Sequence, residues 1–213
     1  MKVFDVSIPI RPDMHVWPGI DPPEVKLIFS HANGDGADVT RFDMCVHTGT
    51  HVDAPRHFIA DGGKVKDMDL GAMVGPAYVG YLPEVDIITA ADLERLPIPA
   101  GCERLLLKTK NSQIWQKGLE GFQMEYVHLS HDASSWIVDH GIRLVGVDYL
   151  SVDEVEPPEP VSHLTLLGGR VVIIEGVVLT DIEPGEYQLY CLPIRLENAE
   201  GAPARVILVD ESA

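Results

Sequence analysis

The sequence predicts a strand-rich α/β fold formed by one domain that spans residues 1–213. A chain of 213 residues, of which 46% are hydrophobic, is long enough to enclose a sizeable core. Segments with strand character occur along the whole chain, whereas helical patterns occur only in its middle. Strands that outnumber helices in this way favour an α/β domain dominated by sheet.

The predicted strands are short apolar runs, or segments in which apolar residues alternate with polar or small ones. In chain order they are residues 1–10, 39–46, 76–82, 104–109, 143–148, 170–179, 187–194 and 205–210. Residues 170–179, RVVIIEGVVL, form the most apolar of these segments. We therefore expect one long buried strand there.

Two segments predict helices. Residues 89–96 begin with Thr89 as the N-cap, and Asp92 follows three positions later, as in a capping box. Residues 130–141 begin with Ser130 as the N-cap and then place apolar side chains along one helical face.

Several connections are rich in proline, glycine or polar residues and therefore predict loops or turns. They are residues 11–24, 31–40, 61–69, 154–162 and 166–170. The first of them contains Trp17, directly before a proline. A tryptophan in such a loop either packs on the core or lines a pocket, and both interpretations remain open at this point.

The charge and the cysteines exclude several classes of partner and location. A formal net charge of −17 repels nucleic acid and anionic lipid, and no apolar run approaches the ~20 residues that span a bilayer. Residues 1–10 include Asp5 and lack the apolar stretch of a signal peptide. Three widely spaced cysteines, Cys45, Cys102 and Cys191, predict reduced thiols. We expect a cytoplasmic protein that binds neither nucleic acid nor membranes.

One motif, HTGTHVDAPRH at residues 47–57, concentrates His47, His51, Asp53 and His57. Its β-branched residues and its proline oppose a helix, whereas a period of two places all four side chains on one face of a strand. A straight strand would separate the first two histidines by ~13 Å, although ligands of one ion lie at only ~2 Å from it. The segment must therefore bend, which Gly49 allows. This predicts a bent strand that folds imidazoles and a carboxylate around a metal ion.

Two other interpretations of the motif compete with metal binding, and the neighbouring Cys45 is a further candidate for the same face. The histidines could belong to a polar strand that faces water, but four titratable groups on one face around a glycine argue against this. A Ser-His-Asp site is disfavoured because the chain has no G-x-S-x-G elbow. Cys45 precedes the motif and could face the same way, but a small apolar packing role suits it better.

A second set of candidates lies far along the chain. Glu175 occurs within the apolar stretch of residues 170–179, where a carboxylate must be paired, hydrogen-bonded, metal-bound or neutral. His163 precedes it by twelve residues, with a turn between them. From the residues alone, a core salt bridge or a buried neutral acid remains open for this pair. Asp148, at the end of a predicted strand, is expected to hydrogen-bond a turn or cap a helix, and is not assigned to the site.

The pattern H-x-G-T-H-x-D-x-P-x-H-F, complete from His47 to Phe58, resembles the signature of the metal-dependent cyclase family, which includes kynurenine formamidases and isatin hydrolases. The resemblance extends to the VWPG, GIRLVGVDYLSVD and CLPIRLENAEGAPARVI stretches, and so to nearly the whole chain. It implies a swivelling β/β/α fold in a homodimer or a dimer-based homo-oligomer.

The resemblance also implies the roles of individual residues. It assigns His57 as the catalytic acid/base and Trp17 as a residue that lines the substrate pocket. The metal ligands it implies are His47, His51 and Asp53 for a first ion, with Asp53 bridging to His163 and Glu175 for a second. One or two divalent ions per chain are expected, and zinc or manganese suits these ligands.

These features predict a metal-dependent hydrolase that cleaves a small amide. The resemblance implies that the amide is an aryl formamide such as N-formylkynurenine, whose hydrolysis belongs to tryptophan catabolism. An isatin-like cyclic amide is the alternative substrate, and a metal-binding protein without turnover is the rival class. The choice of substrate stays open because the chain has WPGIDPP, DYLSVD and IEGV where formamidases resemble WPGDPP, DTPSVD and LENL.

Overall fold

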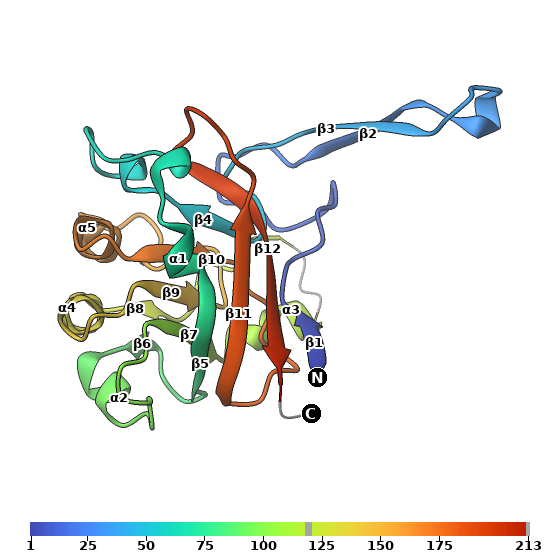
Figure 1. Cartoon of the computed structure of the whole chain (residues 1–213). Helices are drawn as coiled ribbons and strands as arrows, with labels where there is room; N and C mark the ends of the chain where they lie inside the picture. The colour runs from blue at the N-terminus through green and yellow to red at the C-terminus, as the bar shows by residue number, and fades with distance from the viewer. Residues whose placement is uncertain (118–120, 212–213) are drawn as a thin grey trace.

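The computed structural model describes residues 1–117 and 121–211 and is built around a closed ring of seven strands (Figure 1). Around the ring these are β12 (Gly201–Asp210), β11 (Gly185–Pro193), β5 (Val74–Leu82), β7 (Arg104–Thr109), β9 (Leu144–Val147), β10 (Val172–Glu175) and β4 (His51–Asp53), which pairs again with β12. An eighth strand, β1 (Lys2–Asp5), pairs with the C-terminal part of β12.

The sheet separates two apolar cores. Its central strands β5, β7, β9 and β10 are parallel to one another, and β7, β9 and β10 are buried on both faces. Leu106 of β7 points to the core inside the ring, whereas its neighbours Leu105 and Leu107 point to the core outside it. This two-sided burial explains why these strands are apolar runs without a polar face.

Helices cover the outer face of the parallel strands, on the left in Figure 1. They are α2 (Ala90–Glu94), α4 (His131–Asp139) and α5 (Val161–Gly168). The remaining helices and the 3-10 turns are α1 (Leu70–Met73), α3 (Ser112–Lys117), η1 (His31–Asn33), η2 (Pro55–His57) and η3 (Val65–Asp67). Among the described residues, no helix has the length and apolar character needed to cross a membrane.

Two small sheets complete the fold. One is the antiparallel pair β2 (Glu24–Phe29) and β3 (Val39–Asp43), which projects from the body on the right of Figure 1. The other is the parallel pair β6 (Ile87–Ile88) and β8 (His128–Leu129).

Both predicted helices are confirmed, together with their caps. The Thr89 hydroxyl accepts a hydrogen bond from the backbone N–H of Asp92, and the Asp92 carboxylate accepts one from the N–H of Thr89. The Ser130 hydroxyl accepts from the N–H of Ala133 and so begins α4. Local capping chemistry was therefore sufficient to locate these helices.

The prediction of one long strand over residues 170–179 is wrong. β10 ends at Glu175 because Gly176 adopts a left-handed conformation, with φ of +73°. A Cβ atom on Gly176 would lie 2.8 Å from the carbonyl oxygen of Gly49, so the two glycines let these backbones touch. The break leaves the Glu175 carboxylate at the end of its strand.

Other boundaries also differ from the prediction. The strands predicted at residues 1–10 and 39–46 end early, at Asp5 and Asp43. β2 was not predicted, because it follows a proline-rich loop and lacks a buried face. The sequence predicts a loop over residues 154–162 and a turn over residues 166–170, and both are wrong where they overlap α5. The helix forms because it packs on α4, and this tertiary contact overrides the local glycine signal.

Asp148 is a fully buried carboxylate that organises a turn, as predicted. It accepts four hydrogen bonds at 2.7–3.0 Å, from the backbone N–H and the hydroxyl of Thr109 and from the same two groups of Ser112. Burial raises the pKa of Asp148, and these donors oppose the shift. The carboxylate thus joins β7, β9 and the start of α3.

We predict that Asp148→Ala lowers the free energy of unfolding by about 3 kcal/mol or more, because two backbone N–H groups lose their acceptor in a dry interior, at about 1–3 kcal/mol each. Urea unfolding followed by circular dichroism measures this. Asp86→Ala, which removes an exposed partner of Lys110, is the control and should change little. Equal stability of the two variants would contradict this role for Asp148.

Candidate active site

The segment from His47 to His57 bends at Gly49, as the sequence predicts. Gly49 has φ of +70°, and a Cβ atom there would lie 2.8 Å from the side chain of Ile10, so glycine is favoured by both conformation and space. The carbonyl oxygen of Gly49 lies 2.9 Å from Nδ1 of His51, close enough to accept its proton. That hydrogen bond leaves Nε2 of His51 free to face the cluster.

β4 lies between β10 and β12 and carries the centre of the site. His51 and Asp53 are two residues apart on this strand and so point to the same side. Glu175 is the cross-strand partner of His51, and Gly201 is the partner of Asp53 on the other side. A Cβ atom on Gly201 would lie 2.6 Å from the ring of His47, so this glycine makes room for that imidazole.

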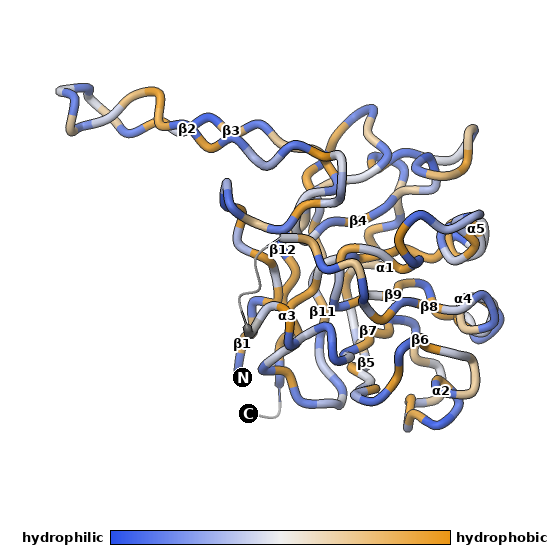
Figure 2. Tube along the Cα trace, turned by 180° about the vertical axis from the view of Figure 1, so that it is seen from behind, coloured by the Kyte–Doolittle hydropathy of each residue, from blue (hydrophilic) through white to orange (hydrophobic). Residues whose placement is uncertain are grey.

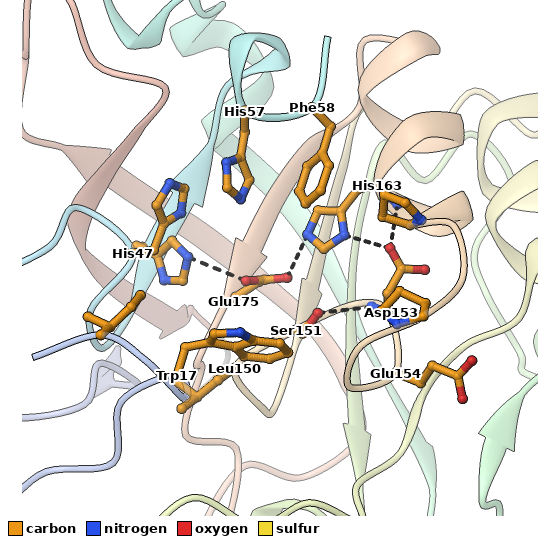
Figure 3. Close-up of a pocket in the computed structure, with 14 residues that line it drawn as sticks. Trp17, His47, His57, Phe58, Leu150, Ser151, Asp153, Glu154, His163 and Glu175 are labelled. Carbon is orange, nitrogen blue, oxygen red and sulfur yellow. Dashed lines mark hydrogen bonds and ion pairs between the residues drawn. The ribbon is translucent and has the colours of Figure 1, made fainter.

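Five candidate side chains converge within contact distance. Oδ1 of Asp53 lies 3.0 Å from Nδ1 of His47 and 3.5 Å from Nε2 of His51. Nε2 of His163 lies 3.4 Å from Oδ2 of Asp53 and 3.3 Å from Oε1 of Glu175. The other oxygen of Glu175 lies 3.3 Å from Nε2 of His51. The structure therefore brings together all five residues that the resemblance implies as metal ligands. Figure 3 shows three of them, His47, His163 and Glu175, at the pocket.

Several of these buried atoms lack a hydrogen-bond partner among the described residues. They are both oxygens of Asp53, both ring nitrogens of His47 and Nε2 of His51. These atoms are close to one another, but their geometry is not that of hydrogen bonds. Burying a carboxylate that accepts no hydrogen bond costs free energy. A divalent cation shared by these lone pairs removes that cost. Imidazole nitrogens and carboxylate oxygens are ligands that zinc and manganese accept, so the donor set fits such an ion.

Asp53 belongs to two groups of potential ligands. One group is His47, Asp53 and His57, the other is His51, Asp53 and Glu175, and within each group the ligand atoms lie within 4.8 Å of one another. Membership in both groups suits a bridging carboxylate. The division of the remaining residues differs from the one the resemblance implies, so which residue binds which ion stays a prediction.

His57 lies at the edge of the cluster, on the 3-10 turn η2. Its ring stacks on that of His47, with the centroids 4.0 Å apart. Burial lowers the pKa of His57 to about 4, against the opposing charge of Asp53. The imidazole is therefore neutral at pH 7 and able to accept a proton.

The sequence analysis missed two carboxylates. Asp153 lies 2.6 Å from Nδ1 of His163 and accepts the backbone N–H groups of Ser162 and His163 at the start of α5. Glu200 lies 3.6 Å from Nε2 of His47. Burial alone would lower the pKa of His163, but Asp153, together with the carboxylates of the cluster, raises it well above its usual value. The signal for Asp153 was its place at the end of the GIRLVGVDYLSVD stretch that carries part of the resemblance, ahead of a helix that the sequence did not reveal.

The cluster opens into a cavity of about 380 Å³, within the range of small-molecule sites. Figure 3 shows Trp17 and Leu150 across the cavity from His57 and Phe58. The apolar part of the wall is formed by Trp17, Ile20, Phe58, Leu150, Pro157 and Pro160. Trp17 therefore lines a pocket and also packs against the apolar cluster that contains Met14 and Tyr149, so both interpretations left open by the sequence apply to it. Asp148 and Cys45 are not part of this lining.

The chain matches the family model described as "Putative cyclase" over residues 4–154. It is 38% identical to cyclase-like protein 2 of Oryza sativa subsp. japonica, over 98% of this chain and 79% of that protein. It is 37% identical to the kynurenine formamidase of Bacillus mycoides, over 96% of each. A solved structure of a potential metal-dependent hydrolase with cyclase activity has a TM-score of 0.85 and 35% identity, covering 100% of this chain and 99% of that chain.

The fold and the ligand cluster together define a metal-dependent hydrolase. Because the family model covers most of the chain and the formamidase match covers nearly all of both proteins, the chain belongs to the cyclase family. The predicted strand-rich α/β architecture, in the swivelling β/β/α form of this family, is confirmed by the same structural match.

We predict that Asp153→Asn weakens metal binding by about 10–100-fold, because the carboxylate holds Nδ1 of His163 and so aims Nε2 at the cluster. The measurement is competition for the ion with a chelator of known affinity. Glu154→Gln, which removes the neighbouring charge at the pocket wall, is the control and should bind metal as the wild type does. If both variants bind equally well, Asp153 only caps α5.

Proposed function

We propose that the protein hydrolyses a small aryl formamide, such as N-formylkynurenine, with the help of one or two divalent ions. The observation that supports this most directly is the position of the unsatisfied ligand atoms. The buried nitrogens of His47 and His51, with the oxygens of Asp53 directly behind them, lie at an apolar and partly aromatic cavity, so a metal-activated reaction can occur beside a bound aryl group.

The amide class of substrate is supported by the relatives. The kynurenine formamidase of Bacillus mycoides matches nearly the whole chain, and its name specifies a formamide of an aromatic amine. The cavity wall offers the flat faces of Trp17 and Phe58, against which an aryl ring packs favourably. Ile20 and Leu150 narrow the same wall with aliphatic groups, which favours a compact apolar substrate.

We assign the ion or ions, zinc or manganese, to His47, His51, Asp53, His163 and Glu175, with Asp53 shared. A divalent ion held there supplies polarisation of the scissile carbonyl and lowers the pKa of a water molecule from 15.7 to about 7. The chain itself orients the ligands: the Gly49 carbonyl fixes the ring of His51, and Asp153 fixes that of His163.

His57 is the proposed acid/base. Because burial keeps its imidazole neutral at pH 7, it can take a proton from the attacking water and return it to the leaving nitrogen. An amide nitrogen is a poor leaving group until it is protonated, so this transfer is required for cleavage. The stacking of His57 on His47 holds the ring beside the ligand cluster.

The remaining predictions from the sequence become part of the same proposal. The enzyme acts on N-formylkynurenine in tryptophan catabolism, in the cytoplasm, as a homodimer or a dimer-based homo-oligomer. Its three cysteines, Cys45, Cys102 and Cys191, are all free thiols, which supports a reducing compartment.

We expect the metal-loaded enzyme to hydrolyse N-formylkynurenine, and exhaustive chelation to remove that activity together with stoichiometric metal. Elemental analysis and a substrate panel of N-formylkynurenine, formanilide and isatin test this. Activity on isatin alone would replace the aryl formamide by a cyclic amide. Metal binding without turnover of any panel member would contradict the proposed function.

The roles of two histidines can be separated by mutation. His57→Ala should keep the metal and lose turnover by about 10²–10⁴-fold, because it removes the proton donor. His51→Ala should instead lose the metal, because Nε2 of His51 contacts both carboxylates of the cluster. Metal content and kcat are measured for both variants. Loss of metal from His57→Ala would place His57 in the ligand set with His47 and Asp53.

A further inference from the structure

The wall of the candidate active site carries a charge that the proposed reaction does not use. Apart from the metal-ligand cluster, His57 and Asp153, the charged residue that lines the cavity is Glu154. No lysine or arginine occurs among the described residues of this lining. The cavity is a ligand site on independent grounds, because His51 belongs to its lining and the buried Nε2 of His51 has no hydrogen-bond partner in the described part of the chain. A ligand in this cavity therefore meets an exposed carboxylate and no side-chain ammonium or guanidinium.

Glu154 has no counter-charge in the described part of the chain. Its side chain is exposed, and no described residue forms an ion pair or a hydrogen bond with its carboxylate. Figure 3 shows this side chain at the edge of the site, beyond Asp153 as seen from His47. The carboxylate is therefore available to a ligand whose other end lies at the metal-ligand cluster.

The backbone that carries Glu154 is restrained on both sides. Before it, the N–H of Asp153 donates to the Ser151 hydroxyl at 3.1 Å, and the Tyr126 hydroxyl donates to the carbonyl oxygen of Asp153 at 2.6 Å. After it, residues 157–160 include three prolines, which restrict the backbone of the loop. A carboxylate on such a segment is pre-organised, since little backbone entropy is lost when a ligand binds.

The surroundings of Glu154 are also negative. The same residue lines a second cavity, of about 700 Å³, to which Glu125 and Glu156 contribute, and Lys110 of that cavity is paired with Asp86. The chain as a whole has a formal net charge of −17, and Figure 2 shows hydrophilic positions on the outer turns of the body. Clefts lined by charges of one sign concentrate ligands of the opposite sign. The approach to the active site therefore favours cations.

The other carboxylates of the cavity lining already have partners. The carboxylate of Asp153 accepts two backbone N–H groups and lies 2.6 Å from Nδ1 of His163. Glu175 contacts Nε2 of His51 and Nε2 of His163 with its two oxygens. Within the described lining, Glu154 is thus the carboxylate that remains for a cation of the ligand.

We propose that Glu154 determines which charge the substrate carries, by binding an ammonium group on the side chain of an aryl amide whose amide group lies at the metal-ligand cluster. This inference rests on the proposed amide hydrolysis and narrows its substrate class. Aryl amides with an aliphatic ammonium group are favoured, and those whose sole charge is a carboxylate are repelled at the edge of the cavity. N-formylkynurenine carries both groups, and its ammonium is the one that Glu154 binds.

The test is a binding measurement on the metal-loaded full chain, which needs no turnover. Two ligands share a 2-aminophenyl ketone: one has a cationic aminoethyl chain, and the other is the same molecule with the chain amine acetylated and therefore neutral. Titration calorimetry at low ionic strength, where salt screens exposed charges least, gives both dissociation constants. The wild type should bind the cation more tightly by on the order of tenfold, as expected for a charge-assisted hydrogen bond. Glu154→Gln should remove most of this difference.

Two further variants separate Glu154 from the general charge of the chain. Glu159→Gln removes the same charge from an exposed position of the same loop that lines neither cavity, so it is the matched control and should bind both ligands as the wild type does. Glu154→Lys should bind a third ligand, with the same ring and a carboxylate on its chain, more tightly than the wild type by on the order of tenfold. The metal content of each variant shows whether the ligand cluster is intact.

Three outcomes would overturn the role of Glu154. They are a wild type that binds the cationic and the neutral ligand equally, a Glu154→Gln variant that keeps the difference of the wild type, and an equal loss in Glu159→Gln. Failure of the proposed function has a different signature. In that case no formamide of the substrate panel is hydrolysed, whereas the difference in affinity between the cationic and the neutral ligand persists.

Discussion

The structure depends on one carboxylate that stays ionised in an interior without water, which costs free energy. Asp53 is fully buried, and neither of its oxygens accepts a hydrogen bond from a described residue. Burial alone would raise the pKa of Asp53, but the imidazoles of His163 and His47 hold it well below its usual value. The closed ring of strands and the bend at Gly49 bring imidazole nitrogens to this carboxylate, and the early end of β10 places the Glu175 carboxylate beside two of those imidazoles. A cation completes what these elements leave unsatisfied.

The sequence revealed the part of this site that is local in the chain. His47, His51, Asp53 and His57 lie within eleven residues, and the mismatch between strand spacing and metal–ligand distance already required a bend at Gly49. The caps of α2 and α4 were equally local, because in each the hydroxyl and the N–H group that donates to it are three positions apart. Capping and the bend at Gly49 are properties of short segments, and both predictions are confirmed, whereas the roles of these four side chains at a metal stay a prediction.

What the sequence could not reveal depends on contacts between distant segments. β10 ends at Glu175 because the backbone of Gly176 touches that of Gly49, more than a hundred residues earlier. α5 exists despite its two terminal glycines because it packs on α4 and because Asp153 accepts its first N–H groups. A helix so stabilised leaves little trace in its own composition. β2 was missed for a different reason, because its apolar residues face outward and give it no buried face to detect.

Two buried aspartates show how the site differs from the scaffold. Asp148 and Asp53 both have no exposed surface, and both lie on or directly after strands of the same ring. Asp148 accepts four hydrogen bonds from two residues, which satisfies its oxygens without an ion. Its role is therefore to stabilise the fold. Asp53 receives none and is surrounded by imidazole nitrogens. Burial is therefore common to both roles, and the supply of N–H and O–H donors is what separates a carboxylate that holds the fold from one that is ready to hold a metal.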